Sequence, residues 1–368
     1  MEFPLIERYI LTKPLAVAPA WRLCHNGLCS FLCSHMTVLN RETERLLWAQ
    51  QALNDPQAEL ERASVDASFR SYWRSFSSGQ PWIVMDAPPD REDIRPWLDI
   101  AQRLSNAGLH APDIRAFDAG LGFILMADLG NRLYLPELNE QTVDALYDDA
   151  MQALLKMQLH IACDDLPSYD ENRLVAEMEL MPEWFLQRHL AYTPSCGEWD
   201  VIEPAFRCLI HNANMQAQTF VHRDYHSRNL LILEKNNPGI LDFQDAVKGP
   251  ITYDLVSLLR DCYIAWPEEK INAWVENYRL ECVKAGLTSV DTATFKRGFD
   301  LMGLQRHLKV LGIFCRLWYR DGKAGYLNDL PLVWQYTRDV GLRYPETAPL
   351  IQLLERVIGE RDIRLPLA

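Results

Sequence analysis

The sequence predicts an α+β protein with a small strand-rich lobe followed by a larger, mainly helical lobe. Between residues 63 and 130, strand-forming aromatic and β-branched residues are separated by turn signals. From residue 139 onward, apolar residues recur at helical spacing, and a short group of strands in 220–243 interrupts them. At 368 residues, the chain is long enough for two lobes that each bury their own core.

The small lobe is expected to span residues 36–130. It begins after Met36 with an amphipathic helix, whose apolar face carries Leu46, Leu47, Ala49 and Leu53. Strand formers follow in 63–89, with a glycine-containing hairpin turn at 77–80. A helix over 93–108 and two short strands in 113–130 complete the lobe. After the first helix, the expected order is therefore strand, strand, strand, helix, strand, strand.

The large lobe is expected to span residues 131–368. Apolar residues at helical spacing predict helices over 141–161, 173–190 and 252–266. Short strands are expected at 220–221, 229–233 and 240–243, the last two joined by the turn "NNPG". The strands bring a polar loop into an otherwise helical lobe.

Composition excludes several classes of function. The formal net charge is −13, whereas sequence-independent nucleic-acid binding depends on a basic surface. No apolar run approaches the roughly 20 residues of a membrane span, so we expect no membrane association. The nine cysteines are an odd number without paired spacing, which is typical of reduced thiols and favours the cytoplasm.

The segment before Met36 differs from the rest of the chain. Residues 1–35 lack the amphipathic pattern that follows, so we expect a non-native or disordered extension. Cys24, Cys29 and Cys33 supply enough ligand atoms, with nearby histidines, for a zinc ion. The paired C-x-x-C spacing of zinc sites is missing, so a zinc site is not favoured.

The polar loop "HRDYHSRN", residues 222–229, concentrates an acid, an amide and cationic side chains between two apolar runs. A hairpin joins it to Asp242, so Asp224, Asn229 and Asp242 can converge. Amide and carboxylate oxygens suit Mg²⁺, which takes further ligands from water and phosphate. This arrangement indicates phosphoryl transfer, in which a metal neutralises charge and a carboxylate orients the attacking hydroxyl.

These motifs resemble a known family. "HRDYHSRN", "LDFQD" and "YDLVSLL" are similar to the H-x-D-x-x-x-x-N and D-F/W-x-D elements of the aminoglycoside phosphotransferase-like kinases. The resemblance covers roughly residues 45–345 and implies a protein-kinase-like two-lobe fold with ATP and Mg²⁺ as cofactors. More narrowly, "ASFRSYWR", "MDAPP" and "LGIFCRLWYRDGKAGYL" resemble the anomeric N-acetylmuramate/N-acetylglucosamine kinases of cell-wall recycling.

The resemblance implies roles for single residues. Asp224 is the expected catalytic carboxylate, and Asn229 and Asp242 are the expected magnesium ligands. His222 is expected to hold the loop by hydrogen bonds, and Asp254 to cap its helix and brace the loop. The hinge that binds adenine through its backbone is expected at Met126, Ala127, Asp128 and Leu129.

The sequence also departs from the kinase pattern. No lysine occurs between Lys13 and Lys156, and Met85 or Asp86 stands where the lysine of the nucleotide lobe is usual. Arg70 is the expected substitute, because a guanidinium can grip phosphate oxygens, and Ser68 and Phe69 beside it are expected in the loop that covers the nucleotide. Arg74 is a second candidate for holding phosphate, although it could equally be an exposed arginine of a strand. Gln244 replaces the glycine of D-F-G, so no activation switch is expected.

The acceptor side has weaker signals. Arg228 and Asp245 are expected to meet a sugar hydroxyl or the lactyl carboxylate of muramate, although each could equally be a solvated surface charge. We expect a sugar 1-kinase with a small amino-sugar substrate, whose product feeds a sugar-1-phosphate nucleotidyltransferase without a stable complex. Two alternatives remain open at this point: a kinase of aminoglycosides or other small molecules, and an inactive nucleotide-binding scaffold.

Overall fold

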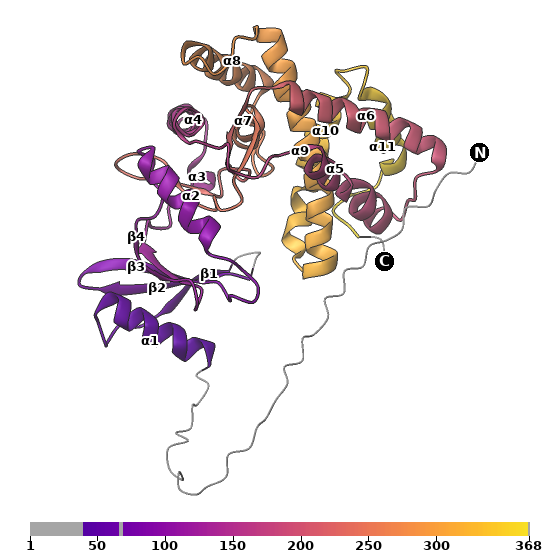
Figure 1. Ribbon diagram of the computed structural model, residues 1–368. Coiled ribbons are helices and arrows are strands. Elements are labelled where there is room, and N and C mark those ends of the chain that lie inside the picture. Colours follow the sequence, from indigo (N-terminus) through magenta and orange to yellow (C-terminus); the bar gives the residue numbers. More distant parts are fainter. Residues whose placement is uncertain (1–39, 66–68, 367–368) are drawn as a thin grey trace, which may run out of the picture.

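The computed structural model describes residues 40–65 and 69–366. The expected extension at 1–35, the Cys24 cluster and Ser68 lie outside the described residues. The α+β two-lobe arrangement is confirmed: a small lobe built on a β-sheet lies beside a larger, mostly helical lobe (Figure 1).

The small lobe contains a five-stranded antiparallel sheet in the order β1-β2-β3-β5-β4. Its strands are β1 (Glu61–Val65), β2 (Ser71–Ser77), β3 (Gln80–Asp86), β4 (Ile114–Asp118) and β5 (Phe123–Ala127). The helix α2 (Arg95–Asn106) lies between β3 and β4 in the chain, as predicted. Ser78 and Gly79 connect β2 to β3 with φ values of 55° and 74°, as a tight two-residue hairpin requires.

The two faces of this sheet have different partners. The helix α1 (Arg41–Leu53) covers one face and packs Ala49 and Leu53 against Val84 and Leu125. The expectation that Leu47 also lies on the buried face is wrong, because Leu47 is 50% exposed and the buried stripe includes Arg45 instead. The opposite face turns its alternate residues toward α2 and the helical lobe.

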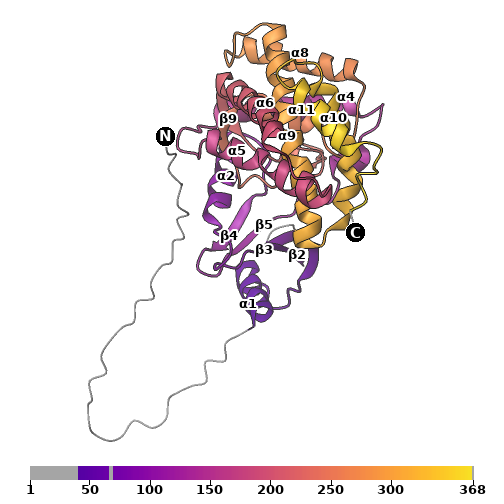
Figure 2. The same ribbon diagram turned by 90° about the vertical axis from the view of Figure 1, so that its right-hand side faces the viewer.

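The helical lobe is organised around the thirty-residue α9 (Thr292–Asp321) (Figure 2). Its other helices are α3 (Tyr134–Glu137), α4 (Val143–His160), α5 (Glu171–Met178), the π-helical η1 (Met181–His189), α6 (Cys196–Met215), α7 (Tyr253–Leu259), α8 (Glu268–Lys284), the 3-10 helix η2 (Ala324–Asp329), α10 (Leu330–Gly341) and α11 (Ala348–Ile358). Among the described residues, none of these helices combines the length and apolar character that crossing a membrane requires.

Two predicted helices need correction. The helix expected over 173–190 is divided into α5 and η1, because Pro182 lacks the backbone N–H that a continuous helix needs. The helix expected over 252–266 ends at Leu259, and the chain continues as a loop to Pro267. The shorter α7 leaves residues 261–266 free to form part of the wall beside the polar loop.

Four short strands carry the polar loop. They form two antiparallel pairs, β6 (Gln218–Val221) with β9 (Val247–Pro250), and β7 (Leu230–Leu231) with β8 (Gly239–Ile240). The strand β9 was not predicted, and the predicted strand at 240–243 ends at Ile240. The loop therefore leaves β6 and returns through β7, with Asp242 just past the end of β8.

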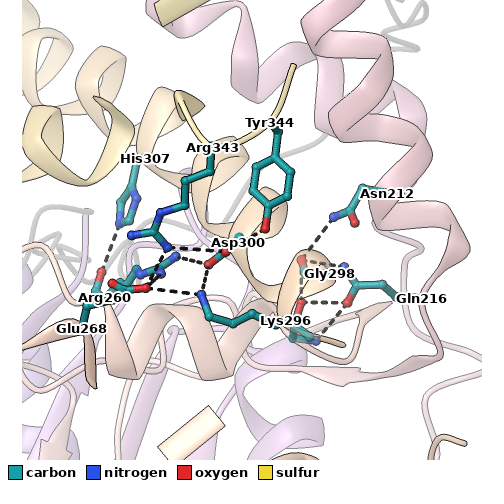
Figure 3. A network of polar contacts seen from close by, with 11 residues as sticks. Asn212, Gln216, Arg260, Glu268, Lys296, Gly298, Asp300, His307, Arg343 and Tyr344 are labelled. Atoms are coloured by element: carbon teal, nitrogen blue, oxygen red, sulfur yellow. Dashed lines mark hydrogen bonds and ion pairs between the residues drawn. The ribbon is translucent and has the colours of Figure 1, made fainter. Parts of the chain in front are cut away.

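A buried polar network fixes α7 against the long helix α9 (Figure 3). Arg260, which follows α7, is fully buried and pairs with Asp300 of α9 at 2.8 Å and Glu268 of α8 at 3.0 Å. At the other end, the Thr252 hydroxyl donates to Gln216 Oε1 at 2.7 Å, and Gln216 Nε2 donates to a carbonyl of α9 at 3.2 Å. Both ends of α7 are thus held, which fixes the helix that carries Asp254.

Candidate active site

A cavity of about 530 Å³ lies between the sheet and the polar loop. Its sheet side includes Tyr72 and Arg74 of β2 and Ile83 of β3, which share one face because side chains alternate along a strand. Its opposite side includes Arg228, Asn229, Asp242 and Phe243. The cavity therefore joins the two lobes at the polar loop.

The polar loop is held by Asp254. The Asp254 carboxylate accepts hydrogen bonds from the backbone N–H groups of His222 at 2.6 Å and Arg223 at 2.9 Å. The prediction that Asp254 caps its helix is wrong, because Thr252 is the N-cap residue of α7. Asp254 lies in the first turn, and its carboxylate binds the loop instead. Arg223 has φ of 79°, an unfavourable value for a side chain of this size, and it is one of the two residues that Asp254 holds.

The charges of the buried loop residues are set by burial. Burial raises the pKa of Asp254 to about 7, despite its two N–H donors. Burial lowers the pKa of His222 to about 4, so its ring is neutral at neutral pH. His222 Nδ1 then accepts the backbone N–H of Asp224 at 3.3 Å. His222 thus acts as a neutral acceptor for the backbone N–H of Asp224.

Asp224 lies near three cationic side chains and one histidine. Burial acts to raise its pKa, but Lys309, His226, Arg306 and Arg223 outweigh burial and hold the pKa of Asp224 below its ordinary value. The carboxylate is therefore ionised at neutral pH. An ionised carboxylate can accept a proton from a hydroxyl group that is placed beside it.

Asn229 and Asp242 lie side by side. Asn229 Nδ2 donates to the backbone carbonyl of Asp224 at 3.0 Å and approaches Asp242 Oδ2 at 3.4 Å. Because the amide nitrogen is used in these contacts, Asn229 Oδ1 is the atom that can serve as a ligand. Asp242 has φ of 60° and also receives Gln244 Nε2 at 3.0 Å. One amide oxygen and one carboxylate are a donor set that fits Mg²⁺.

The end of β5 and the two residues after it border the cavity. Met126, Ala127, Asp128 and Leu129 all line the cavity. The Ala127 N–H donates to Asp113 O at 2.8 Å, so this group is occupied. Within the described part of the chain, the backbone N–H and C=O of Leu129 make no hydrogen bond. A planar ligand with hydrogen-bonding edges could bind at this position.

The register of β3 shows whether Met85 or Asp86 stands at the position of the usual lysine. Met85 is 1% exposed and lies on the same face as Ile83, toward the helical lobe. Asp86 points to the other face, where it accepts Arg41 at 2.6 Å and Arg45 at 2.8 Å from α1. A buried methionine therefore occupies the side of β3 on which a lysine would reach the cavity.

Two arginines of the small lobe have different partners. Arg70 is nearly buried, at 9% side-chain exposure, and its Nη2 lies 3.5 Å from Asp242 Oδ1 across the cleft. Arg74 Nε and Nη2 lie 2.5 and 3.3 Å from the oxygens of Asp128, so Arg74 is an ion-paired residue of the cavity wall and not an exposed strand arginine. Phe69 is 61% exposed.

The expected acceptor residues are separated by the fold. Arg228 lines the cavity, and its guanidinium lies 3.5 Å from the centre of the Tyr263 ring. Asp245 is exposed and accepts only Gln244 Nε2, at 3.4 Å, among the contacts of the described residues. The structure thus brings Arg228, but not Asp245, to the cavity wall.

Sequence reasoning missed a buried ion cluster beneath the loop. Glu177 of α5 accepts Arg223 at 2.6 Å and Lys309 of α9 at 2.9 Å. Burial acts to raise the pKa of Glu177, but these two cations lower it to about 2. The signal was present in "GLQRHLKVLGIF", where Arg306 and Lys309 interrupt an apolar helical pattern, because buried cations need a partner or a task.

Comparison with known proteins gives concordant results. A model of the phosphotransferase enzyme family matches residues 59–289. The N-acetylmuramate/N-acetylglucosamine kinase of Pseudomonas putida is 41% identical over 319 residues, which are 84% of this chain and 94% of that protein. The kinase of the same name from Pseudomonas aeruginosa is 43% identical over 81% of this chain and 88% of that protein.

Solved structures share the fold at low sequence identity. Plasmodium vivax ethanolamine kinase aligns with a TM-score of 0.58 and 12% identity, over 79% of this chain and 86% of its own. The ADP-bound aminoglycoside phosphotransferase APH(2'')-Ib aligns with a TM-score of 0.55 and 17% identity, over 82% and 99%. These similarities establish the protein-kinase-like two-lobe architecture.

Proposed function

The chain belongs to the phosphotransferase enzyme family, and from this premise we propose that it transfers the γ-phosphoryl group of ATP to the anomeric hydroxyl of N-acetylmuramic acid and N-acetylglucosamine. The observation that carries the proposal is the position of Asn229, which lines the cleft with Asp242 and contacts both Asp242 and the backbone carbonyl of Asp224, in a chain about 40% identical to kinases named for these two sugars. A scaffold protein has no need of an ionised Asp224 next to a metal-binding pair.

ATP is proposed to bind along the end of β5 and the two residues after it. Adenine would pair with backbone groups of Met126 to Leu129, where the Leu129 N–H and C=O have no other use in the described structure. The phosphates would extend toward the loop that holds Asn229 and Asp242. Arg70, which already reaches Asp242 across the cleft, would contact them from the small lobe. Phe69, beside Arg70, is proposed to cover the nucleotide, and Ser68 stays a prediction from the sequence.

Mg²⁺ is proposed to bind Asn229 Oδ1 and the Asp242 carboxylate. When bound, the ion neutralises the charge that develops on the transferred phosphoryl group. The described residues contain no group of three or more His, Cys, Asp or Glu side chains that could hold a metal. The proposed site therefore depends on phosphate oxygens and water for its remaining ligands.

Asp224 is proposed as the base of the transfer. Its carboxylate accepts the proton of the anomeric hydroxyl while that oxygen forms a bond to the γ-phosphorus. The bond from the γ-phosphorus to the oxygen bridging the β- and γ-phosphates breaks, and ADP leaves with the electron pair. His222 and Asp254 position the loop through backbone N–H groups and touch no reacting atom.

The product is a sugar 1-phosphate. A nucleotidyltransferase that converts sugar 1-phosphates to nucleotide sugars is the proposed next enzyme, without a stable complex. A cytoplasmic location is proposed because ATP is available there.

The test is ATP consumption coupled to detection of phosphosugar, with N-acetylmuramic acid, N-acetylglucosamine, glucosamine and kanamycin as acceptors. We expect turnover with the first two sugars and an acid-labile product. Asp224→Asn is expected to lower kcat by roughly 10²- to 10⁴-fold, as for loss of a general base, while ATP still binds. Turnover with kanamycin alone, or an Asp224→Asn enzyme with unchanged kcat, contradicts the proposal.

A further inference from the structure

A loose ion pair lies beside the catalytic loop. Arg228, in that loop, and Asp329, the last residue of η2, approach within 3.9 Å between Nη2 and Oδ2. Their side chains are 41% and 24% exposed, so both are accessible to a ligand. A pair at this distance and exposure contributes little stability and exchanges partners at small cost.

The arginine of this pair is held in place by an aromatic ring. The Arg228 guanidinium lies 3.5 Å from the centre of the Tyr263 ring, and the Tyr263 ring packs against Phe314 of α9. The Tyr263 N–H donates to Asp261 at 3.2 Å, and Asp261 also accepts the Ser227 N–H at 3.0 Å. The ring and the loop are therefore fixed to one carboxylate, which orients Arg228 without using its N–H groups.

Asp329 is incompletely neutralised. Burial raises its pKa, and the distant Arg228 does not offset this effect. A closer partner for either member of the pair is thus favourable. Arg228 can bind a carboxylate through two parallel N–H groups, and Asp329 can accept a hydrogen bond from a hydroxyl group.

The two proposed substrates differ at one oxygen. N-acetylmuramic acid carries a lactyl ether with a carboxylate on O3, where N-acetylglucosamine has a free hydroxyl. An enzyme that accepts both needs a group that stabilises the carboxylate and is neutralised when the carboxylate is absent, because an unpaired charge in a closed site is costly.

Building on the proposed function, we propose that the Arg228–Asp329 pair determines the acceptance of both sugars. With N-acetylmuramic acid, Arg228 leaves Asp329 and binds the lactyl carboxylate. With N-acetylglucosamine, Arg228 stays with Asp329, and Asp329 accepts the hydrogen bond of the free 3-hydroxyl. Arg228 and Asp329 are specificity residues and take no part in the proton transfer at Asp224.

The test compares kcat/KM for the two sugars at saturating ATP, and it measures the KM for ATP at a fixed sugar concentration. Arg228→Gln is expected to lower kcat/KM for N-acetylmuramic acid by roughly 10- to 150-fold, the usual loss for one hydrogen-bonded charge, and to change N-acetylglucosamine less than about threefold. Asp329→Asn is expected to act in the opposite sense, with a larger loss for N-acetylglucosamine. Arg338→Gln, which alters an exposed arginine paired with Glu355, is the matched control.

The possible results are distinct. Opposite changes in the preference for the two sugars support the inference. An equal loss for both sugars in both variants, or an effect of Arg228→Gln confined to the KM for ATP, overturns it while leaving the proposed kinase intact. A wild-type enzyme that phosphorylates neither sugar overturns the proposed function and this inference together. Thermal unfolding of both variants identifies any loss that comes from misfolding.

Discussion

Replacing Arg70 by methionine tests how a nucleotide lobe without lysine holds phosphate. Methionine keeps much of the length and apolar contact of arginine but removes the charge and every N–H donor. In the structure, Arg70 is 9% exposed and reaches Asp242 at 3.5 Å, so its guanidinium already lies at the proposed phosphate position. The substitution therefore removes one buried cation from the cleft and little packing.

The magnitude follows from two effects of opposite sign. Loss of a hydrogen bond to a charged phosphate costs about 1.5–3 kcal/mol, which is a fall of roughly 10- to 150-fold in kcat/KM for ATP. Loss of the Arg70–Asp242 pair has the opposite effect on metal binding, because the Asp242 carboxylate loses a competing cation. This effect is small, since a partly exposed pair at 3.5 Å is worth about 1 kcal/mol at most. The first effect is larger, so the activity falls while the magnesium requirement does not rise.

The assay measures initial rates over a range of ATP concentrations at fixed sugar, then over a range of Mg²⁺ concentrations. Arg95→Met is the control on the same lobe, because Arg95 is 79% exposed and pairs with Asp93 on the surface. A KM and kcat for ATP within about threefold of wild type in Arg70→Met would refute the role of Arg70 in phosphate binding. A higher magnesium requirement would show that Arg70 acts through Asp242 instead.

Two further predictions concern stability. Asp254→Asn leaves one buried backbone N–H without an acceptor, at a cost of about 1–3 kcal/mol. The pKa of Asp254 is raised from 3.8 to about 7, so between these pH values the carboxyl group is protonated in the folded protein but ionised in the unfolded chain. The contribution of Asp254 to the free energy of unfolding therefore falls as the pH rises from about 4 to about 7. Urea unfolding should thus show a larger difference between wild type and Asp254→Asn at pH 5 than at pH 8, and an equal difference would contradict the pKa. Gly312→Ala places a Cβ 2.3 Å from the Leu180 backbone and should lower the free energy of unfolding by about 1–3 kcal/mol or more. The control is Gly197→Ala, which has open space around it and should be neutral or slightly stabilising. Similar melting temperatures for the two variants would contradict this packing argument.

Local patterns in the sequence predicted the small lobe well. Alternating strand formers, the turn at Ser78 and Gly79, and Pro96 at the start of α2 are signals within a few residues of one another. The order of strands and helix is therefore confirmed. Leu47 was misassigned because a helical stripe can be drawn through it as easily as through Arg45, and only the docked sheet decides between them.

Signals that act across long distances in the sequence were not visible. The residues Val247–Pro250 of β9 include glycine and proline, and they form a strand because β6 pairs with them. The end of α7 is set by Arg260, which pairs with residues of α8 and α9. In both cases, the deciding partner lies outside any local window.

In the candidate site too, local contacts could be predicted from the sequence and contacts between distant segments could not. The spacing within one loop and one hairpin was enough to bring Asp224, Asn229 and Asp242 together. Glu177 is 46 residues before Arg223 and 132 before Lys309, so no local pattern identifies Glu177 as the partner of these two cations. The placement of Asp86 on the outer face of the sheet also required the observed register of β3.

The methionine at position 85 has a consequence for chemical labelling. Adenosine derivatives that mark kinases by reacting with an amine need a lysine within reach of the nucleotide phosphates. The described residues that line the cleft include arginines but no lysine. Lys309, whose charge acts on Asp224, is buried and paired with Glu177, so its amine is not available for reaction. Such reagents should therefore label this enzyme much less than kinases with the usual lysine, and a selective covalent inhibitor would have to target another kind of side chain.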